Sequence, residues 1–212
     1  MKKAFIFDMD GVIIDSEPIH SKAKLATLAS VGISFPEEKL VHFMGRSSKE
    51  FFSTMLENNP QVKATWKELT DKKHAMYLDM VQNDPSIHAI NGLPELLERL
   101  KNSGYKIGLA SSSSRQMIDM VLDRFGIRHY FSCILSGAEL PKSKPDPAIY
   151  LMAAEALGLG PESCTVVEDA NAGVEAAKRA GMYCIAYRNP NSGKQDLSKA
   201  DRIINAYTEI NI

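Results

Sequence analysis

The sequence predicts an α/β protein, in which a doubly wound parallel sheet forms the core and a small all-helical insert follows the first strand. Two observations predict this fold. From about residue 90 onwards, short apolar runs alternate with helical segments, which is typical of a parallel sheet covered on both faces. From Ile19 to about residue 86, by contrast, the hydrophobic spacing is helical. We therefore expect a core domain at residues 1–15 and 87–212 and a helical domain at residues 16–86.

The first predicted elements are one strand and the helices of the insert. Residues 4–7, with the sequence AFIF, are expected to form a buried strand. Within the insert, Pro36 is well placed to start a helix. Ser47 and Glu50 match a capping box, which predicts a helix directly after Ser47. Thr65 then opens the last helical segment of the insert.

The remaining elements alternate along the chain, and glycines mark most of the helix ends. The predicted helices are 94–102, 115–125, 146–157 and 173–180. The predicted strands are 106–110, 132–135, 165–167, 183–186 and 202–204. Open parallel sheets bind ligands beyond the carboxyl ends of their strands, so the residues that follow each strand are the candidates for a functional site.

Composition argues against several classes of partner. The chain has 25 Lys and Arg against 26 Asp and Glu, which gives no electrostatic reason to expect nucleic acid or an anionic membrane. No apolar run approaches the roughly 20 residues of a membrane helix. The three cysteines are far apart and lack CxxC spacing, so neither a disulfide framework nor a zinc site is indicated. We expect a cytoplasmic monomer without a nucleic-acid or membrane partner.

Acidic, hydroxyl and basic side chains follow four of the predicted strands. They are Asp8 and Asp10, the serines Ser111, Ser112 and Ser113, Lys144, and the pair Glu168 and Asp169. If the sheet is parallel, they all lie at one edge. Mg²⁺ is often held by one or two carboxylates together with substrate phosphate, and lysine and serine suit phosphate oxygens. The pattern predicts a site for Mg²⁺ and a small phosphorylated substrate.

Asp8 and Asp10 stand two residues apart at the end of the first strand. Their repulsion is tolerable if both lie near a shared Mg²⁺ ion. In an extended segment both side chains point to the same side. One carboxylate can attack phosphorus to form an aspartyl phosphate. The other can pass a proton to the leaving group and take one from the incoming nucleophile.

Four motifs in this order resemble those of the haloacid dehalogenase (HAD) superfamily over the whole chain. They are Asp8-Met9-Asp10-Gly11-Val12, Leu109-Ala110-Ser111, Ser143-Lys144-Pro145-Asp146-Pro147 and Val167-Glu168-Asp169. The helical insert after the first motif is similar to the cap of the β-phosphoglucomutase-like subgroup. The resemblance therefore implies a Rossmann-like core with a helical cap domain.

The resemblance also implies roles for the acidic residues. Asp8 would be the nucleophile and a Mg²⁺ ligand. Asp10 would be the acid/base and would supply a backbone carbonyl to the metal. Asp169 would be a metal ligand, and Glu168 would be either a ligand or a residue just behind one. Glu168 and Asp169 could instead be a charge pair at the start of a helix, stabilised by its dipole.

For substrate binding, the resemblance implies that Ser111 holds a phosphoryl oxygen and that Lys144 offsets charge on the phosphate and the nucleophile. Ser111 could instead cap the next helix. His20 and Lys73 match a cap-and-hinge pair of β-phosphoglucomutases. Those mutases usually carry a cap arginine three residues after a glycine, whereas Arg46 follows its glycine directly. The substrate-contacting residues are completed by Ser112 and Ser113.

These features favour a Mg²⁺-dependent phosphatase that acts on a small phosphorylated metabolite, with a sugar phosphate as the expected substrate. The first alternative is a β-phosphoglucomutase, in which a second substrate hydroxyl takes the phosphoryl group in place of water. The second alternative is a catalytically inactive binding module. The complete set of Asp8, Asp10, Lys144 and Asp169 argues against that alternative.

Overall fold

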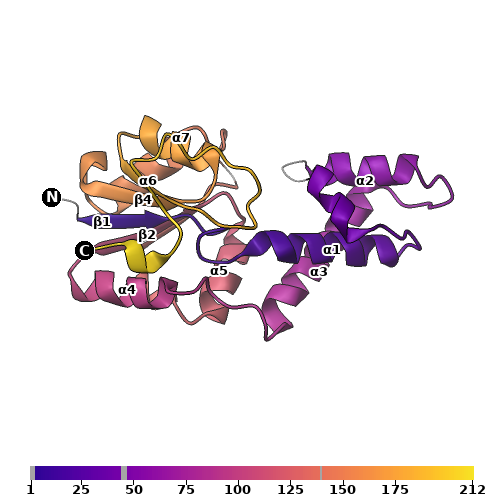
Figure 1. The fold of residues 1–212 in the computed structure, drawn as a ribbon, viewed down its shortest axis with the longest axis horizontal. Helices are drawn as coiled ribbons and strands as arrows, with labels where there is room; N and C mark the ends of the chain where they lie inside the picture. Colours follow the sequence, from indigo (N-terminus) through magenta and orange to yellow (C-terminus); the bar gives the residue numbers. More distant parts are fainter. Residues whose placement is uncertain (1–2, 44–46, 139) are drawn as a thin grey trace. The chain divides into compact units, whose positions relative to one another are not determined.

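The computed structural model describes residues 3–43, 47–138 and 140–212. The chain divides into two compact units, drawn in Figure 1. We call Met1–Ser16 with Ile87–Ile212 the core unit and Glu17–Ser86 the helical unit. Each unit is described by itself.

The core unit contains a six-stranded parallel sheet. Its strands are β1 (Ala4–Phe7), β2 (Lys106–Ser111), β3 (Cys133–Ser136), β4 (Cys164–Glu168), β5 (Tyr183–Tyr187) and β6 (Arg202–Ile204). Their order is β3-β2-β1-β4-β5-β6, and every neighbouring pair is parallel. The strand order reverses next to β1, so the carboxyl ends of β1 and its neighbours form the switch point where such sheets bind ligands.

Helices cover both faces of this sheet. They are α4 (Leu93–Asn102), α5 (Arg115–Arg124), α6 (Ala148–Ala156) and α7 (Asn171–Arg179). In Figure 1, α4 and α5 lie on one face and α6 and α7 on the other. The whole of β1 is buried between these layers, which explains its unbroken apolar sequence. The predicted doubly wound α/β fold is confirmed.

One core helix begins later than the sequence suggested. The predicted helix at residues 146–157 starts at Ala148. Pro147 disfavours helical backbone at the residue before it, Asp146. The Oδ1 atom of Asp146 instead accepts a hydrogen bond of 3.0 Å from the backbone N–H of Ala148. Lys144 therefore lies on a loop before this helix.

The helical unit holds the residues from Glu17 onwards of α1 (Ser16–Ala29), then α2 (Ser48–Glu57) and α3 (Trp66–Asn83). The predicted capping box of Ser47 and Glu50 is confirmed at the start of α2. The helix expected after Pro36 is a 3₁₀ helix, η1 (Glu37–Phe43). Phe51 and Phe52 are fully buried, and their rings stack edge to face, so α2 supplies the centre of this unit's apolar core.

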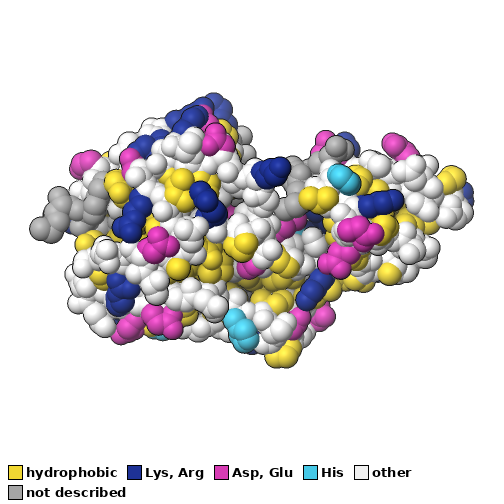
Figure 2. All heavy atoms as spheres, in the orientation of Figure 1, with side chains coloured by type: hydrophobic (Ala, Val, Ile, Leu, Met, Phe, Trp, Pro, Cys, Tyr) yellow, Lys and Arg dark blue, Asp and Glu magenta, His cyan; other side chains and the backbone are white. Residues whose placement is uncertain are grey.

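The described residues include no helix long and apolar enough to cross a membrane. On the face drawn in Figure 2, basic and acidic side chains lie interspersed. This distribution matches the near-zero net charge of the sequence.

Candidate active site

A buried lysine joins two acidic residues at the carboxyl end of the sheet. Asp8 directly follows β1, and its backbone N–H donates to the carbonyl of Val167 in the neighbouring strand. The Nζ atom of Lys144 lies 2.7 Å from Oδ1 of Asp8 and 2.7 Å from Oε1 of Glu168. It also donates to the carbonyl of Ala110 at 3.2 Å. Three strands, β1, β2 and β4, thus meet at one ammonium group.

Glu168 ends β4 with both carboxylate oxygens hydrogen-bonded. Oε1 accepts from Lys144 and from the hydroxyl of Tyr150, each at 2.7 Å. Oε2 accepts from the backbone N–H groups of Asp169 at 3.0 Å and Ala170 at 3.2 Å. Glu168 is 1% exposed, so these four donors take the place of water. A carboxylate bound this fully is well suited to hold Lys144 in place.

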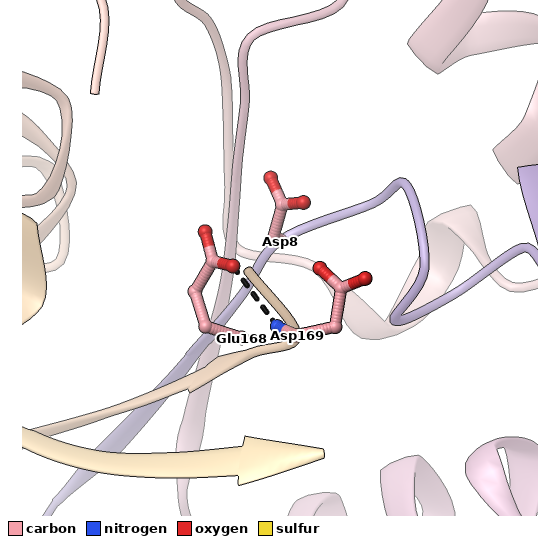
Figure 3. A group of neighbouring side chains, drawn as sticks. All are labelled: Asp8, Glu168 and Asp169. Carbon is pink, nitrogen blue, oxygen red and sulfur yellow. Dashed lines mark hydrogen bonds between the residues drawn. The ribbon is translucent and has the colours of Figure 1, made fainter. Parts of the chain in front are cut away.

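Asp8, Glu168 and Asp169 form an acidic cluster. One carboxylate oxygen from each residue lies within 4.8 Å of the others. Figure 3 shows the three carboxyl groups extending toward the same space. Hard cations such as Mg²⁺ prefer oxygen ligands of this kind. The donor set therefore fits a divalent metal ion.

The electrostatics of the cluster support the same conclusion. Burial raises the pKa of Asp8 well above its usual range against the opposing charge of Lys144, and the charges of Glu168 and Asp10 raise it further. Burial and Glu168 raise the pKa of Asp169 to about 7. Burial alone would lower the pKa of Lys144, but Asp8 and Glu168 outweigh it and raise the pKa. The single positive charge of Lys144 does not neutralise all these carboxylates, and a bound cation would supply the missing positive charge.

Asp10 belongs to a second network, which includes two of the serines. Oδ2 of Asp10 accepts a hydrogen bond of 2.6 Å from the hydroxyl of Ser113. The backbone N–H of Ser113 donates to Oγ of Ser111 at 3.0 Å, and its carbonyl accepts from Ser136 at 2.7 Å. Because Asp10 also raises the pKa of Asp8, its carboxylate lies within electrostatic reach of the acidic cluster.

The serines at the end of β2 and just after it have different environments. Ser111 is fully buried and Ser112 is exposed. The residue that caps α5 is Ser114, whose hydroxyl accepts from the backbone N–H of Met117 at 3.4 Å. The alternative that Ser111 caps this helix is therefore wrong, because the helix begins three residues later than that cap would require.

Gly11 brings the loop after β1 against the acidic cluster. Its φ angle is +73°, in the left-handed region that favours glycine. A Cβ atom at this position would collide with the carboxylate of Asp169. A side chain is therefore excluded here both by the backbone conformation and by the close approach to Asp169.

The structure adds site residues that the sequence analysis did not select. On the turn after β5, Asn189 donates to the carbonyl of Gly11 at 3.0 Å, and the hydroxyl of Ser192 donates to Oδ2 of Asp169. The rule of inspecting the polar residues after each strand would have found them, because both lie on the loop that follows β5. Tyr150 gave no such signal, since its position on α6 is typical of a core aromatic residue.

The predicted residues of the insert form a separate pair within the helical unit. Nζ of Lys73 lies 3.0 Å from Nδ1 of His20, whose ring stacks on Tyr77 with 4.2 Å between centroids. Burial, Lys73 and Lys24 lower the pKa of His20 to about 3, so its imidazole is neutral near pH 7. Arg46 lies outside the described residues.

Residues 5–187 match the family model of haloacid dehalogenase-like hydrolases, and the chain belongs to this family. It is 31% identical to a phosphorylated carbohydrates phosphatase of Thermotoga maritima, over 98% of this chain and 99% of that protein. It is 35% identical to the β-phosphoglucomutase of Bacillus subtilis, over 86% and 82%. The structure of a β-phosphoglucomutase from Clostridium difficile superposes with a TM-score of 0.73, at 29% identity over 100% of this chain and 94% of that one.

These matches confirm the resemblance to the HAD superfamily and its β-phosphoglucomutase-like subgroup. They also confirm the predicted enzyme class, a HAD-family phosphoric monoester hydrolase.

Proposed function

We propose that the protein is a Mg²⁺-dependent phosphatase that hydrolyses a small sugar phosphate through an aspartyl phosphate on Asp8. The observation that carries this proposal is the 2.7 Å contact between Lys144 and Oδ1 of Asp8. Among the described residues, no group donates a hydrogen bond to the other oxygen, Oδ2. Asp8 is thus held by one oxygen and keeps the other for attack, as a nucleophilic carboxylate requires.

In the first step, Oδ2 of Asp8 would attack phosphorus as the bond to the leaving oxygen breaks. Lys144 opposes the rise in the pKa of Asp8 that burial causes, and so favours the ionised nucleophile. Protonated Asp10 would pass its proton to the leaving oxygen, giving the free sugar hydroxyl. The hydrogen bond from Ser113 would keep the Asp10 carboxyl oriented for this transfer.

In the second step, Asp10 would take a proton from water while the water oxygen attacks the phosphorus of phospho-Asp8. The acyl phosphate bond breaks, which returns the Asp8 carboxylate and releases inorganic phosphate. Asp8 and Asp169, with the backbone carbonyl of Asp10, would hold Mg²⁺, and Glu168 would act behind them by fixing Lys144. When bound, Mg²⁺ supplies positive charge that stabilises the phosphoryl oxygens and the nearby carboxylates.

The relatives support a sugar phosphate as the substrate class. The Thermotoga maritima relative is named for phosphorylated carbohydrates, and a second relative, 32% identical over 89% of this chain and 85% of its own length, is the hexitol phosphatase B of Escherichia coli. We propose that the helical unit acts as the cap that selects the sugar, with His20 and Lys73 among its contacts. Ser111, Ser112 and Ser113 would contact the phosphate.

A β-phosphoglucomutase is the second candidate, supported by the 35% identity to the Bacillus subtilis enzyme and by the His20–Lys73 pair. A mutase needs cap cations to hold the distal phosphate of a bisphosphate intermediate. Arg46 is displaced from the position usual in mutases. Ser114 stands where mutases often carry a lysine, but it is neutral and caps a helix. Fewer contacts to that phosphate leave less binding energy to orient a second hydroxyl of the sugar. We therefore expect water, and not that hydroxyl, to take the phosphoryl group from Asp8.

The test begins with a screen of phosphorylated metabolites for phosphate release. β-Glucose 1-phosphate, with a trace of the 1,6-bisphosphate, is then assayed in two ways. We expect inorganic phosphate to appear faster than glucose 6-phosphate. The reverse order would establish the mutase. No turnover of any ester, combined with tight binding of one, would favour the inactive binding module.

A further inference from the structure

We propose that Ser192, on the turn after β5, is a positioning residue that restricts Asp169 to a single metal-binding oxygen and thereby favours Mg²⁺ over Ca²⁺. This inference rests on the proposed function, because it takes Asp169 to be a metal ligand. It assigns a role in metal selectivity to a residue outside the four motifs.

The two oxygens of Asp169 have different surroundings. Oδ2 accepts the hydrogen bond from the Ser192 hydroxyl. The same atom is the one nearest to the position that a Cβ of Gly11 would occupy, so it faces the loop after β1. In Figure 3, one oxygen of Asp169 points toward Asp8 and the other points away from it. We infer that Oδ1 is the oxygen offered to a metal and that Oδ2 is held by the turn.

Two asparagines fix the turn that carries Ser192. The buried side chain of Asn189 donates from Nδ2 to the carbonyl of Gly11 at 3.0 Å and to Oδ1 of Asp15 at 3.2 Å. Its Oδ1 atom accepts from the backbone N–H of Asn191 at 2.8 Å. Asn191 in turn donates to Oδ2 of Asp15 at 2.5 Å. Ser192 is therefore anchored to the loop that follows the nucleophile.

This arrangement suits Mg²⁺ better than Ca²⁺ for a geometric reason. Mg²⁺ demands nearly ideal octahedral coordination, whereas Ca²⁺ takes six to eight ligands and readily binds both oxygens of one carboxylate. For Asp169 to bind a metal through both oxygens, it would have to rotate and weaken its hydrogen bond with Ser192. Residues that orient a ligand in this way typically change metal affinity by about 10- to 100-fold when they are removed.

The experiment measures binding without catalysis. Mn²⁺ is titrated into the metal-free protein, and its free concentration is followed by electron paramagnetic resonance. Mg²⁺ and Ca²⁺ then displace the bound Mn²⁺, which gives the ratio of their two dissociation constants. Four proteins are compared: the wild type, Ser192→Ala, Ser192→Thr and Ser198→Ala. Ser198 is the matched control because it is an exposed serine on the same loop, and its hydroxyl bonds the exposed Asp196, away from the acidic cluster.

In Ser192→Ala we expect Mg²⁺ affinity to fall by about tenfold and Ca²⁺ affinity to fall less, so the preference for Mg²⁺ decreases. Ser192→Thr keeps the hydroxyl and should restore the wild-type ratio, and Ser198→Ala should not change it. Circular dichroism checks that each variant is folded; because Ser192 is only half-buried, its truncation leaves no large cavity.

The outcomes separate this inference from the proposed function. If the wild type binds Mn²⁺ but Ser192→Ala keeps its Mg²⁺/Ca²⁺ ratio, the inference is overturned and the metal site stands. An equal loss of both affinities also overturns it, since selectivity would then be unaffected. If the wild type binds no Mn²⁺, or binds it unchanged after Asp169→Asn, both the inference and the proposed metal site fail.

Discussion

The ammonium of Lys144 lies 4.8 Å from the ring centroid of Tyr150, over its face. The two side chains also donate to the same oxygen of Glu168. Tyr150 thus supports Lys144 in two ways, through its ring and through a shared acceptor. The phenol oxygen and the ring can be separated experimentally, because phenylalanine keeps the ring.

Tyr150→Phe is expected to lower the free energy of unfolding by about 1.5–3 kcal/mol, the usual value of a hydrogen bond to a charged group. The ring contact with Lys144 would remain, so we expect only a modest loss of phosphatase activity. Urea denaturation and steady-state kinetics test this. Leu157→Ala truncates a buried side chain at the C-terminal end of α6, the helix that carries Tyr150. It serves as a packing control, because it leaves the hydrogen bonds of Glu168 intact. Unchanged stability in Tyr150→Phe would contradict the importance of this bond.

Asp8→Asn is expected to abolish turnover while the fold survives. Asparagine cannot form the acyl phosphate, and loss of a covalent route costs about four decades or more in rate. Lys144 would still be paired with Glu168, so the protein should remain folded. Phosphate release and beryllofluoride binding, which mimics phospho-Asp8, are the measurements. Substantial hydrolysis by the folded variant would rule out Asp8 as the nucleophile.

Activity is expected to depend strictly on Mg²⁺, with Ca²⁺ as an inhibitor. Ca²⁺ takes more ligands at longer distances and would tend to recruit the second oxygen of Asp8, which the reaction needs. Phosphate release is measured after chelation and again after each metal is added back. Full activity in excess chelator, or equal activity with Ca²⁺, would rule out the proposed metal role.

Gly11→Ala is expected to be more harmful than Gly104→Ala. Both glycines have positive φ angles, +73° and +78°, so either alanine costs about 1–2 kcal/mol in backbone strain. Only at Gly11 would the new Cβ also collide with Asp169; at Gly104, no described heavy atom beyond the two neighbouring residues lies within 4 Å of the new Cβ. We measure unfolding in urea and Mn²⁺ binding for both variants. Equal losses of stability and unchanged metal binding would show that the approach of Gly11 to Asp169 is unimportant.

The imidazole of His20 is expected to stay neutral at pH values well below the usual pKa of histidine. Its pKa of about 3 in the folded protein lies below the unfolded value of about 6.5. Between these values the unfolded chain binds more protons, so the stability contributed by neutral His20 is complete above pH 6.5 and is lost as the pH falls toward 3. NMR titration of the ring, assigned with His20→Gln, checks the pKa. A midpoint near 6.5 would contradict the buried contact with Lys73.

Much of the site was visible in the sequence, because the signals were local. Asp8 and Asp10 follow an apolar run, and Glu168 and Asp169 follow another. Alternating strands and helices predicted a parallel sheet, and a parallel sheet places both pairs at one edge. The capping box of Ser47 was equally readable, since its partner is three residues away.

The sequence by itself therefore determined the type of most elements, the fold class and the residues at the strand ends. Only the tertiary structure decided which side chains meet there: Lys144 with an Asp8 that is 136 residues away, and Asn189 with the Gly11 carbonyl 178 residues away. Hydrophobic periodicity encodes burial and local conformation, but it carries no information about the path of a loop. The contacts that hold Glu168 and Asp169 come from loops and helix faces brought together by packing across the sheet.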